Sequence, residues 1–463
     1  MRARLIAAAV AAGCSSPAGH TADPLPASLW LTQVPAPEPR SPPAQVVPPP
    51  ARAPEPPPPP APEPPYPPHV RSVELAVQAP VYTMPTVEPD ENKRAGVARA
   101  GTRMAPVRAA PRGNGCARRW IEVAPRGWVC ETVLVPSARP PTESEPPLAL
   151  ADDDPRPIRA LYGSVRKRGR AYRTAEDVRE DRGRDLRGHH AVRAIGVERI
   201  DGVRYWRTSG GDLIGADHIY ELEPSRWKGV QLDERTPLPI WVSNRIDPFE
   251  PVDAYAAPGG AKAGRLRIRE RIAIRETSTD GAWIRVAPSL WVGRRDVRIA
   301  RTAPPPPGLA AGERWFDIDL DEQVLFAYEG ERPVYVTLVS TGKPGHATPT
   351  GVTRIYAKHV RSSMSSAQIP SETYDVADVP WTMYFDRNYA LHTSYWHDLF
   401  GNARSHGCVN LAPRDARLLF AWSAPALPPG WTSVYGDADR PGTLVRVRSS
   451  RTPEPALRDG AAP

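Results

Sequence analysis

The chain has 463 residues, 40% of them hydrophobic, and carries a formal net charge of +8. This length predicts about three or four domains with room for a sizeable core. The positive charge is spread along the chain without a helix-turn-helix, zinc-finger or RNA-binding signature, which argues against nucleic acid as a partner. A solvated basic surface, suited to an anionic cell envelope, explains the charge better.

The N-terminus has the plan of a secretory signal. Arg2 and Arg4 form a positive start, residues 5–12 form a short apolar run, and small residues precede Cys14. A transmembrane helix needs about 20 apolar residues, so this run is too short to span a bilayer. The ending "VAAGC" resembles the lipobox of bacterial lipoproteins, which implies a signal peptide at 1–13 and a lipid on Cys14. An ordinary signal peptide and a wrongly assigned start codon are the alternatives.

Proline dominates the segment that follows. The fifteen residues from Pro54 to Pro68 include eleven prolines. Such a segment cannot form helix or sheet ladders, so we expect a disordered, extended tether over residues 14–69. A second proline-rich linker, at 302–311, separates the last third of the chain from the rest.

An internal repeat lies between these two proline-rich segments. The stretches "WIEVAPRGWV" at 120–129 and "WIRVAPSLWV" at 283–292 share seven of ten residues, two of them tryptophan. Each is preceded by a Y-x-x-P motif that begins at Tyr82 or Tyr255. A third, looser copy is predicted between them, around residues 205–219.

The repeat predicts three small, mainly β units at 70–138, 155–225 and 238–301, because short strands alternate there with Gly/Pro turns. Residues 171–188 have too few apolar positions for a packed helix. The units resemble bacterial SH3-like modules, which are small β-barrels common on cell-wall enzymes. That resemblance implies binding of wall or peptide by exposed aromatic rings. The alternative, which we favour, is that the four repeated tryptophans are barrel core.

Cysteine usage points to an oxidising compartment. Of the four cysteines, Cys14 is assigned to lipid, and Cys116 and Cys130 flank a predicted strand–turn–strand. Such a hairpin brings its ends within the Cα spacing of a disulfide, about 4.4–6.8 Å, and an exported protein can form that bond. Two unpaired thiols are the alternative. Cys408 has no obvious partner and is therefore examined as a reactive thiol.

A separate domain is predicted at 312–448. Residues 316–321 alternate apolar and acidic side chains, as in a half-buried strand, and two further strand-like runs complete a meander. A short amphipathic helix is expected at 413–422 and a strand at 443–448. The polar tail, 449–463, is predicted to be disordered.

The stretch "SHGCVN", residues 405–410, carries the chemistry. In an extended segment His406 and Cys408 share a face, and His392, sixteen residues before Cys408, can return to the thiol. A free thiol has a pKa of about 8.5 and a neighbouring imidazole lowers it, so a Cys–His pair indicates a nucleophile. One alternative is a buried structural cysteine. The other is a metal site that includes His392, His397, His406 and Cys408, whose spacings match no finger or ribbon pattern.

These residues resemble the signature of the L,D-transpeptidase catalytic domain, the YkuD family. His392 and the run Ser405, His406, Gly407, Cys408, Val409 and Asn410 fill every position, with a spacer of twelve residues that is slightly short. The stretch "LVSTGKPGHATPTG" at 338–351 is similar to the loop that precedes the site in this family. The resemblance implies a β-sandwich with short helices at 312–448, so the predicted fold class is mainly β.

The resemblance also implies a reaction on peptidoglycan. Cys408 attacks the carbonyl of the third residue of a stem peptide and releases the terminal D-Ala, and the acyl group passes to a side-chain amine of a neighbouring stem, forming a 3→3 cross-link. His392 is implied as the general base, oriented by the backbone carbonyl of Thr393. The N–H groups of Gly407 and Cys408 are expected to form the oxyanion hole.

The remaining motif residues receive supporting roles from the same resemblance. Ser405 and His406 are expected to shape the site or bind substrate, and Asn410 to hold the cysteine loop by hydrogen bonds. Arg404 and Tyr384 are expected to contact substrate, with a surface ion pair and a core ring as the alternatives. No cofactor or metal is expected, because the cleaved amide supplies the bond energy.

The implied partners are peptidoglycan stem peptides and, through the lipid on Cys14, a membrane. Ser15 stands where an inner-membrane retention signal has aspartate, so an outer-membrane lipoprotein facing the periplasm is expected. The alternatives within the family are an L,D-carboxypeptidase and an enzyme that attaches or releases wall-linked proteins. The alternative outside it is a wall-binding scaffold. The acceptor, the stem composition and the oligomeric state do not follow from the sequence.

Overall fold

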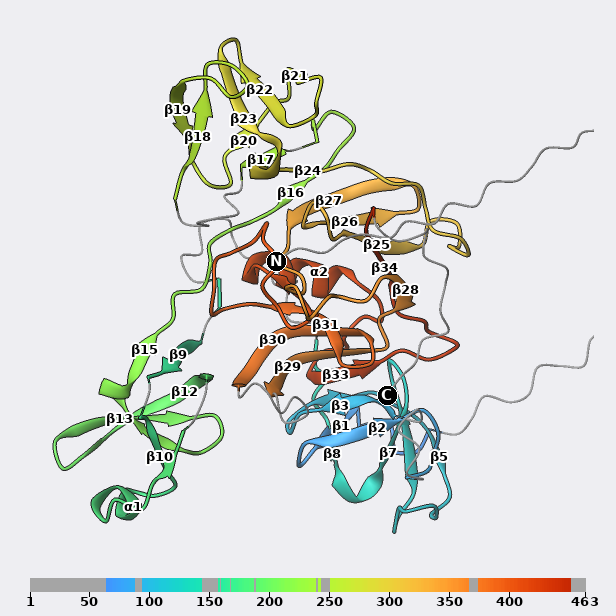
Figure 1. Ribbon diagram of the computed structural model, residues 1–463. Helices are drawn as coiled ribbons and strands as arrows, with labels where there is room; N and C mark the ends of the chain where they lie inside the picture. Colours follow the sequence, from blue (N-terminus) through green and yellow to red (C-terminus); the bar gives the residue numbers. More distant parts are fainter. Residues whose placement is uncertain are drawn as a thin grey trace, which may run out of the picture. The chain divides into compact units, whose positions relative to one another are not determined.

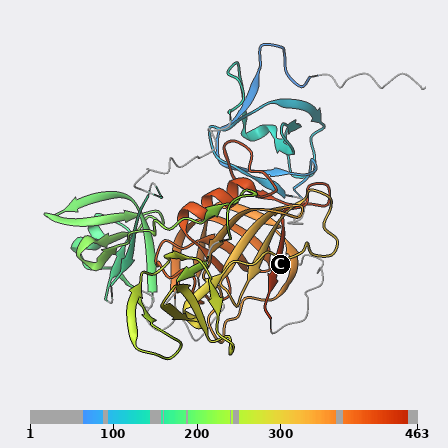
Figure 2. The same cartoon turned by 90° about the horizontal axis from the view of Figure 1, so that it is seen from above.

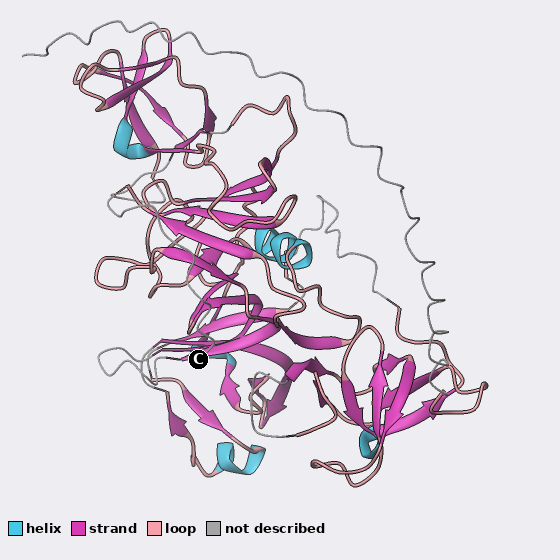
Figure 3. Ribbon diagram, turned by 90° about the vertical axis from the view of Figure 1, so that its right-hand side faces the viewer, coloured by secondary structure: helices cyan, strands magenta, loops and turns pink. Residues whose placement is uncertain are grey.

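The computed structural model describes residues 64–87, 94–143, 157–186 and 189–242 apart from Arg159, Lys167 and Pro239, then 250–365 and 374–450. The predicted signal peptide, Cys14, most of the proline tether and the tail from residue 451 lie outside the described residues. Strands make up 47% and helices 7% of the described residues, which confirms the mainly β class (Figure 3). Among the described residues, no helix combines the length and apolar character needed to cross a bilayer.

The first repeat unit has short antiparallel strands around a small apolar core. Its strands are β1 (Ser72–Leu75), β2 (Ala79–Tyr82), β3 (Arg94–Ala98), β4 (Arg103–Met104), β5 (Pro106–Ala110), β6 (Trp120–Val123), β7 (Trp128–Cys130) and β8 (Leu134–Ser137). Cys116 and Cys130 form a disulfide with Cα atoms 5.5 Å apart. The end of the tether joins this unit, because the Tyr66 hydroxyl donates to Glu131 at 2.9 Å.

The second unit is also built from strands, with one short helix. The strands are β9 (Leu161–Val165), β10 (Arg170–Tyr172), β11 (Arg184–Asp185), β12 (His189–Ile200), β13 (Val203–Thr208), β14 (Leu213–Gly215) and β15 (Ile219–Glu221). Helix α1 (Ala175–Arg179) has only five residues and no buried side chain. Thr174 caps it through a reciprocal hydrogen-bonded box with Asp177. Its sparse apolar positions explain why this segment forms a single capped turn.

The third unit has the most irregular strands. They are β17 (Ile240–Val242), β18 (Val252–Tyr255), β19 (Lys262–Leu266), β20 (Arg271–Ile272), β21 (Glu276–Thr277), β22 (Trp283–Ala287), β23 (Leu290–Gly293) and β24 (Val297–Ile299). A 3₁₀ turn, Arg294–Asp296, joins the last two. The first and second units have a 3₁₀ turn at the corresponding place, Glu131–Val133 and Ala216–His218.

The repeated motif gives the first and third units the same aromatic arrangement. Tyr82 meets Trp120 edge to face at 5.6 Å, and Tyr255 meets Trp283 edge to face at 5.1 Å. Trp120 is 1% exposed, whereas Trp283 is only partly buried. The expectation that the repeated tryptophans are core therefore holds fully in the first unit alone.

The repeat units consist of open sheets. In the first unit β4, β1 and β8 form one three-stranded sheet, and β2, β3, β6 and β7 pair in another. The apolar cluster around Val73, Val81 and Ile121 lies between them. The expectation of small β-barrels is corrected accordingly, because the sheets of the described residues are not closed.

The C-terminal domain contains two sheets and one helix. One sheet comprises β25 (Arg314–Asp319), β26 (Val324–Glu329), β27 (Arg332–Leu338), β28 (Gly351–Arg354) and β34 (Leu444–Arg448), and is joined by β16 (Val230–Gln231). The other comprises β29 (Ala357–Ser365), β30 (Tyr374–Asp386), β31 (Tyr389–Thr393), β32 (Val409–Leu411) and β33 (Trp431–Tyr435). The predicted meander, the helix as α2 (Pro413–Trp422) and the last strand are confirmed.

The two sheets and α2 enclose one apolar core. Phe316 and Leu325 come from the first sheet, Met383 and Leu391 from the second, and Leu419 from α2. Helix α2 runs alongside the strands of the second sheet (Figure 2). The predicted β-sandwich is therefore present, and its second sheet carries β29, β30 and β31 side by side (Figure 1).

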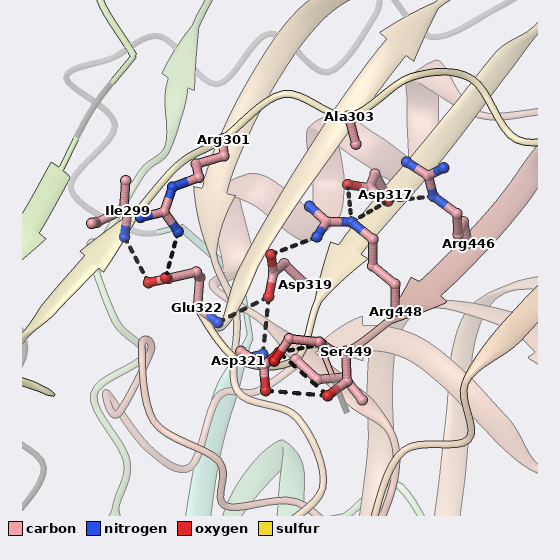
Figure 4. A network of polar contacts seen from close by, with 12 residues as sticks. Ile299, Arg301, Ala303, Asp317, Asp319, Asp321, Glu322, Arg446, Arg448 and Ser449 are labelled. Carbon is pink, nitrogen blue, oxygen red and sulfur yellow. Dashed lines mark hydrogen bonds and ion pairs between the residues drawn. The ribbon is translucent and has the colours of Figure 1, made fainter. Parts of the chain in front are cut away.

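Buried ion pairs tie the last strand to the first sheet. Asp317 is 0% exposed and accepts a hydrogen bond from Arg446 at 2.7 Å and one from Arg448 at 3.0 Å (Figure 4). Glu322, 5% exposed, accepts from the Ile299 N–H at 2.9 Å in the same network. Removing one partner of such a buried pair is costly, because the other charge stays buried. The network therefore holds β34 against β25.

Each repeat unit makes direct contact with the C-terminal domain. Strand β3 of the first unit pairs with β33. Strand β12 of the second unit pairs in parallel with the start of β30. The third unit contributes Trp241, which is 0% exposed and lies in one apolar cluster with Trp315 and Phe326.

Candidate active site

The predicted base and nucleophile come from two neighbouring parallel strands. Strands β31 and β32 pair with Leu391 opposite Val409 and His392 opposite Asn410. Cys408 immediately precedes β32, in the bend that leads into this strand. The register therefore places His392 beside the strand that follows Cys408, although the two residues are sixteen positions apart in the sequence.

His392 has the environment of a neutral base. Its Nδ1 lies 2.9 Å from the Thr393 carbonyl oxygen, so Nδ1 carries the proton and Nε2 keeps its lone pair. The Trp396 ring stacks on it at 5.8 Å. The side chain is 2% exposed, and burial lowers the pKa of His392 to about 4. At neutral pH the imidazole is uncharged and ready to accept a proton.

Cys408 is the free cysteine of the described residues and is only partly exposed. The surrounding protein raises the pKa of its thiol to about 11, against an opposing backbone hydrogen bond from Ala390. The thiol also lies 3.9 Å from the Asn388 carbonyl oxygen. The resting site therefore holds a neutral thiol and a neutral imidazole, and the thiol must lose its proton during the reaction.

The turn before Cys408 is braced by Ser405. The Ser405 hydroxyl donates to the Cys408 carbonyl and accepts from the Gly407 N–H at 3.1 Å. These contacts are consistent with the site-shaping role expected for Ser405, and substrate binding by this residue stays a prediction. The Gly407 N–H is engaged with Ser405 here, and the oxyanion roles of the Gly407 and Cys408 N–H groups stay predictions.

Position 407 requires glycine for two reasons, its backbone conformation and the close approach of a neighbouring side chain. Its φ is +113°, a region that favours glycine. A Cβ atom here would lie 2.3 Å from a ring carbon of Tyr389. The motif glycine thus allows the chain to turn tightly against β31 and present Cys408.

His406 lies in a second polar cluster and is not placed as the base. Its Nε2 lies 2.9 Å from Lys343 Nζ. Tyr374 stacks on its ring at 5.2 Å, and His346 meets it edge to face at 4.8 Å. Sequence analysis missed Lys343, His346 and Tyr374. The only signal for two of them was their place in the stretch "KPGH" of the predicted loop.

Asn410 holds the strand that follows the nucleophile. Its backbone exchanges two hydrogen bonds with Ser340, at 3.0 and 2.9 Å. Its side-chain Nδ2 lies 2.9 Å from His397 Nε2. The expectation that Asn410 holds the cysteine loop by hydrogen bonds agrees with these contacts. Neither Trp396 nor His397 was assigned a catalytic or positioning role from the sequence.

Tyr384 and Arg404 differ in their surroundings. The Tyr384 hydroxyl lies 2.9 Å from Ser362 Oγ. Burial raises the pKa of the Tyr384 phenol, and the hydrogen bond with Ser362 opposes this shift. Arg404 has an exposed side chain, and its backbone N–H donates to Thr341 at 2.8 Å. Substrate contact by Tyr384 or Arg404 stays a prediction.

The metal alternative involves His392, His397, His406 and Cys408. Within the part of the chain that the structure describes, no group of three or more His, Cys, Asp or Glu side chains has the arrangement of a metal site. His397 faces an amide and His406 faces an ammonium group. Two of the four weighed ligands thus have other partners.

The family of the C-terminal domain follows from its sequence. Residues 313–447 match the family model described as YkuD, the L,D-transpeptidase catalytic domain. This match confirms the resemblance of residues 313–447 to the L,D-transpeptidase catalytic domain. A search of curated proteins found no match.

Solved structures give further similarities. An L,D-transpeptidase from Enterococcus faecium is 22% identical, with 29% of this chain and 50% of that chain covered and a TM-score of 0.24. An L,D-transpeptidase from Stackebrandtia nassauensis is 27% identical, with 30% and 57% covered and a TM-score of 0.22. The catalytic domain of the E. faecium enzyme is 24% identical, with 30% and 98% covered and a TM-score of 0.24. The chain thus spans 50% and 57% of the first two solved chains.

Proposed function

We propose that this protein is a peptidoglycan L,D-transpeptidase with Cys408 as its nucleophile and His392 as its base. The observation that carries the proposal is the pairing of β31 with β32. It sets a neutral imidazole, whose free lone pair is on Nε2, beside the strand that follows the thiol. The YkuD family of residues 313–447 supports a substrate in the cell wall.

The proposed reaction has two acyl transfers. Cys408 loses its proton to His392 Nε2 as its sulfur bonds to the carbonyl carbon of the third stem residue. The intermediate collapses with cleavage of the amide, and the leaving D-Ala amine takes the proton from His392. A side-chain amine of a second stem then attacks the thioester, passes its proton to His392, and the cleaved C–S bond leaves a thiolate that recovers that proton.

The surroundings of the two reactive groups fit these steps. The thiol pKa of about 11 and the imidazole pKa of about 4 disfavour a resting ion pair. The proton transfer is therefore coupled to attack on the bound carbonyl, as in general base catalysis. The Cys408 N–H is the proposed donor to the developing oxyanion. No cofactor enters either step.

The direct test is incubation of the purified protein with disaccharide-tetrapeptides, followed by mass spectrometry of the products. We expect dimers joined 3→3 with loss of D-Ala, and no products from Cys408→Ala. D-Ala release without dimers would indicate an L,D-carboxypeptidase. Transfer to a lysine-bearing protein would indicate wall anchoring. An unchanged product yield from Cys408→Ala would overturn the role of the thiol.

A thiol-directed probe separates acylation from transfer. A carbapenem carries an activated amide, and we expect it to acylate Cys408, which intact-mass measurement detects as a shift absent from Cys408→Ser. A shift that persists in Cys408→Ser would place the acylated group elsewhere.

We also propose that Cys14 carries a lipid and tethers the enzyme to a membrane facing the periplasm. The support is the lipobox-like sequence followed by a proline-rich segment. Lipidation predicts a mature N-terminus at Cys14 with an added acyl mass, lost in Cys14→Ala. A mature N-terminus elsewhere would identify an ordinary signal peptide.

A wall-binding role for the repeat units is the second candidate, supported by the partly exposed Trp283 and Trp291 of the third unit. It predicts that the Cys408→Ala protein pellets with purified sacculi, and that Trp283→Ala together with Trp291→Ala weakens the pelleting. If the protein with both tryptophan substitutions pellets as well as the protein without them, Trp283 and Trp291 do not bind the wall.

A further inference from the structure

The segment at 394–404, called here the site loop, connects the base to the nucleophile. It begins two residues after His392 and ends immediately before Ser405. It leads from β31, which carries His392, to the turn that precedes β32 and carries Cys408. What fixes the loop is accordingly part of the catalytic geometry.

The third repeat unit binds the middle of the site loop. Both terminal nitrogens of Arg269 donate to the Asp398 carboxylate, one of them at 2.6 Å to Oδ2. Ser225 donates to the same carboxylate at 2.5 Å. The Arg269 guanidinium also lies over the Trp227 ring at 5.5 Å. Two parallel hydrogen bonds fix the position and the plane of the carboxylate, which a single contact does not.

A second arginine of the third unit holds the end of the loop. Arg298 is 2% exposed, and its Nε donates to the Gly401 carbonyl at 2.6 Å. From the other side Ser340 donates to the Asn402 carbonyl at 2.6 Å. The loop is thus attached to the third unit at Asp398 and Gly401, and to the strand-end residue Ser340 at Asn402.

The loop contacts Asn410, two residues after the nucleophile, through His397, the residue before Asp398. His397 Nδ1 accepts from the Leu399 N–H at 3.2 Å, so a neutral ring carries its proton on Nε2. The side-chain amide of Asn410 lies 2.9 Å from that nitrogen, and its Oδ1 is the acceptor that an N–H on Nε2 requires. Asn410 Oδ1 is buried and has no other hydrogen-bond partner among the described residues.

A continuous set of contacts therefore runs from the third unit to the strand that follows the nucleophile. It passes from Arg269 to Asp398, along the chain to His397, and across to Asn410, which lies two residues after Cys408 and opposite His392. We propose that Arg269 is a positioning residue for catalysis, which sets the site loop so that Asn410 holds Cys408 in register with His392. The third repeat unit then contributes a residue that positions the active site. This inference rests on the proposed function.

The test compares three variants of the full chain: Arg269→Gln, Arg269→Lys and the control Arg267→Gln. Arg267 belongs to the same turn, but its side chain is 85% exposed and pairs locally with Glu270. The rate of Cys408 acylation by imipenem is measured by intact mass over a range of concentrations, together with the thermal midpoint of each protein.

We expect Arg269→Gln to lower the maximal acylation rate about 10-fold to 100-fold, because small displacements of reacting groups are costly. The half-saturating imipenem concentration should change less than about twofold, since the binding surface is not altered. Arg269→Lys should recover part of the rate, because an ammonium group keeps the charge and loses the paired geometry. Arg267→Gln should match the wild type.

The partner residue provides an independent check. Asp398→Asn removes the same ion pair from the catalytic domain, so the double variant with Arg269→Gln should be no slower than the slower single variant. If Arg269→Gln does not fold, the single variant Asp398→Asn takes its place in the test. Full acylation rates in folded Arg269→Gln and Asp398→Asn would overturn the inference while leaving the proposed function intact. A wild-type protein that imipenem does not acylate, and that yields no products from tetrapeptides, would instead overturn the proposed function.

Discussion

The first and third repeat units share one motif but differ in how they serve the catalytic domain. Both place a tyrosine edge to face on the first motif tryptophan and an arginine over the second, Arg108 on Trp128 at 5.2 Å and Arg285 on Trp291 at 6.0 Å. The first unit attaches by strand pairing with β33. The third attaches by a buried tryptophan and by arginines that bind the site loop.

One pair of equivalent positions makes this difference specific. Aligning the two motifs places Arg298, in β24, at the position of Val135, in β8. Val135 is 52% exposed, whereas Arg298 is 2% exposed and binds Gly401. The motif therefore determines the local fold of a unit, and residues outside the motif determine what the unit does.

The largest expected effect concerns the reactivity of the free Cys408, in contrast with the disulfide-bonded cysteines of the first unit. Cys116 and Cys130 are paired in the first unit, whereas the Cys408 thiol titrates with a pKa raised to about 11. Since the thiolate is the reactive form, its fraction grows about 10-fold per pH unit below the pKa. Alkylation of Cys408 by iodoacetamide should rise about 1,000-fold from pH 7 to pH 10. A rate that levels off near pH 7 would indicate a resting thiolate–imidazolium pair.

The shared core of the third unit gives the largest expected effect on stability. Trp241→Ala should lower the free energy of unfolding by about 3–5 kcal/mol, because it leaves a cavity beside Trp315. The matched control is Trp291→Ala, a partly exposed motif residue, for which we expect about 1 kcal/mol. Urea unfolding followed by far-UV circular dichroism measures both. Equal losses would mean that the third unit is not integrated into the core.

The disulfide should matter to the first unit alone. Its half-cystines are 14 residues apart, so replacing both by serine should destabilise the unit by about 3 kcal/mol. Hydrogen exchange measured by mass spectrometry should show faster exchange in β6 and β7 and unchanged protection in β31 and β32. The rate of Cys408 acylation should not change. A slower rate would show that the first unit also supports the site.

The smallest expected effect tests the two aligned positions directly. Arg298→Leu leaves the Gly401 carbonyl without this donor, and an unsatisfied buried group costs about 1–3 kcal/mol. Val135→Ala should stay within about 0.5 kcal/mol of the wild type, as exposed substitutions do. Thermal unfolding of both variants measures which of them loses more stability. A larger loss from Val135→Ala would contradict the exposure of that position in the folded protein.

Local patterns in the sequence were sufficient to predict several strands and the family of the catalytic domain. Alternation of apolar and acidic residues predicted β25, and the turns and strand runs around it predicted the meander. The signature around His392 and Cys408 identified the catalytic domain that the family model matches. These features are readable because each depends on residues close together in the chain or on a spacing that the chemistry requires.

The contacts that complete the site were decided by the tertiary structure. Arg269 and Asp398 are 129 residues apart, and Lys343 and His406 are 63 residues apart. No periodicity marks such partners, because their meeting depends on how separate strands and units pack. The hydrogen bond from the Gly407 N–H to the Ser405 hydroxyl likewise depends on how the turn before Cys408 folds. The sequence by itself determined which reactive groups this protein has, and the packing of distant segments decided which neighbours hold them in place.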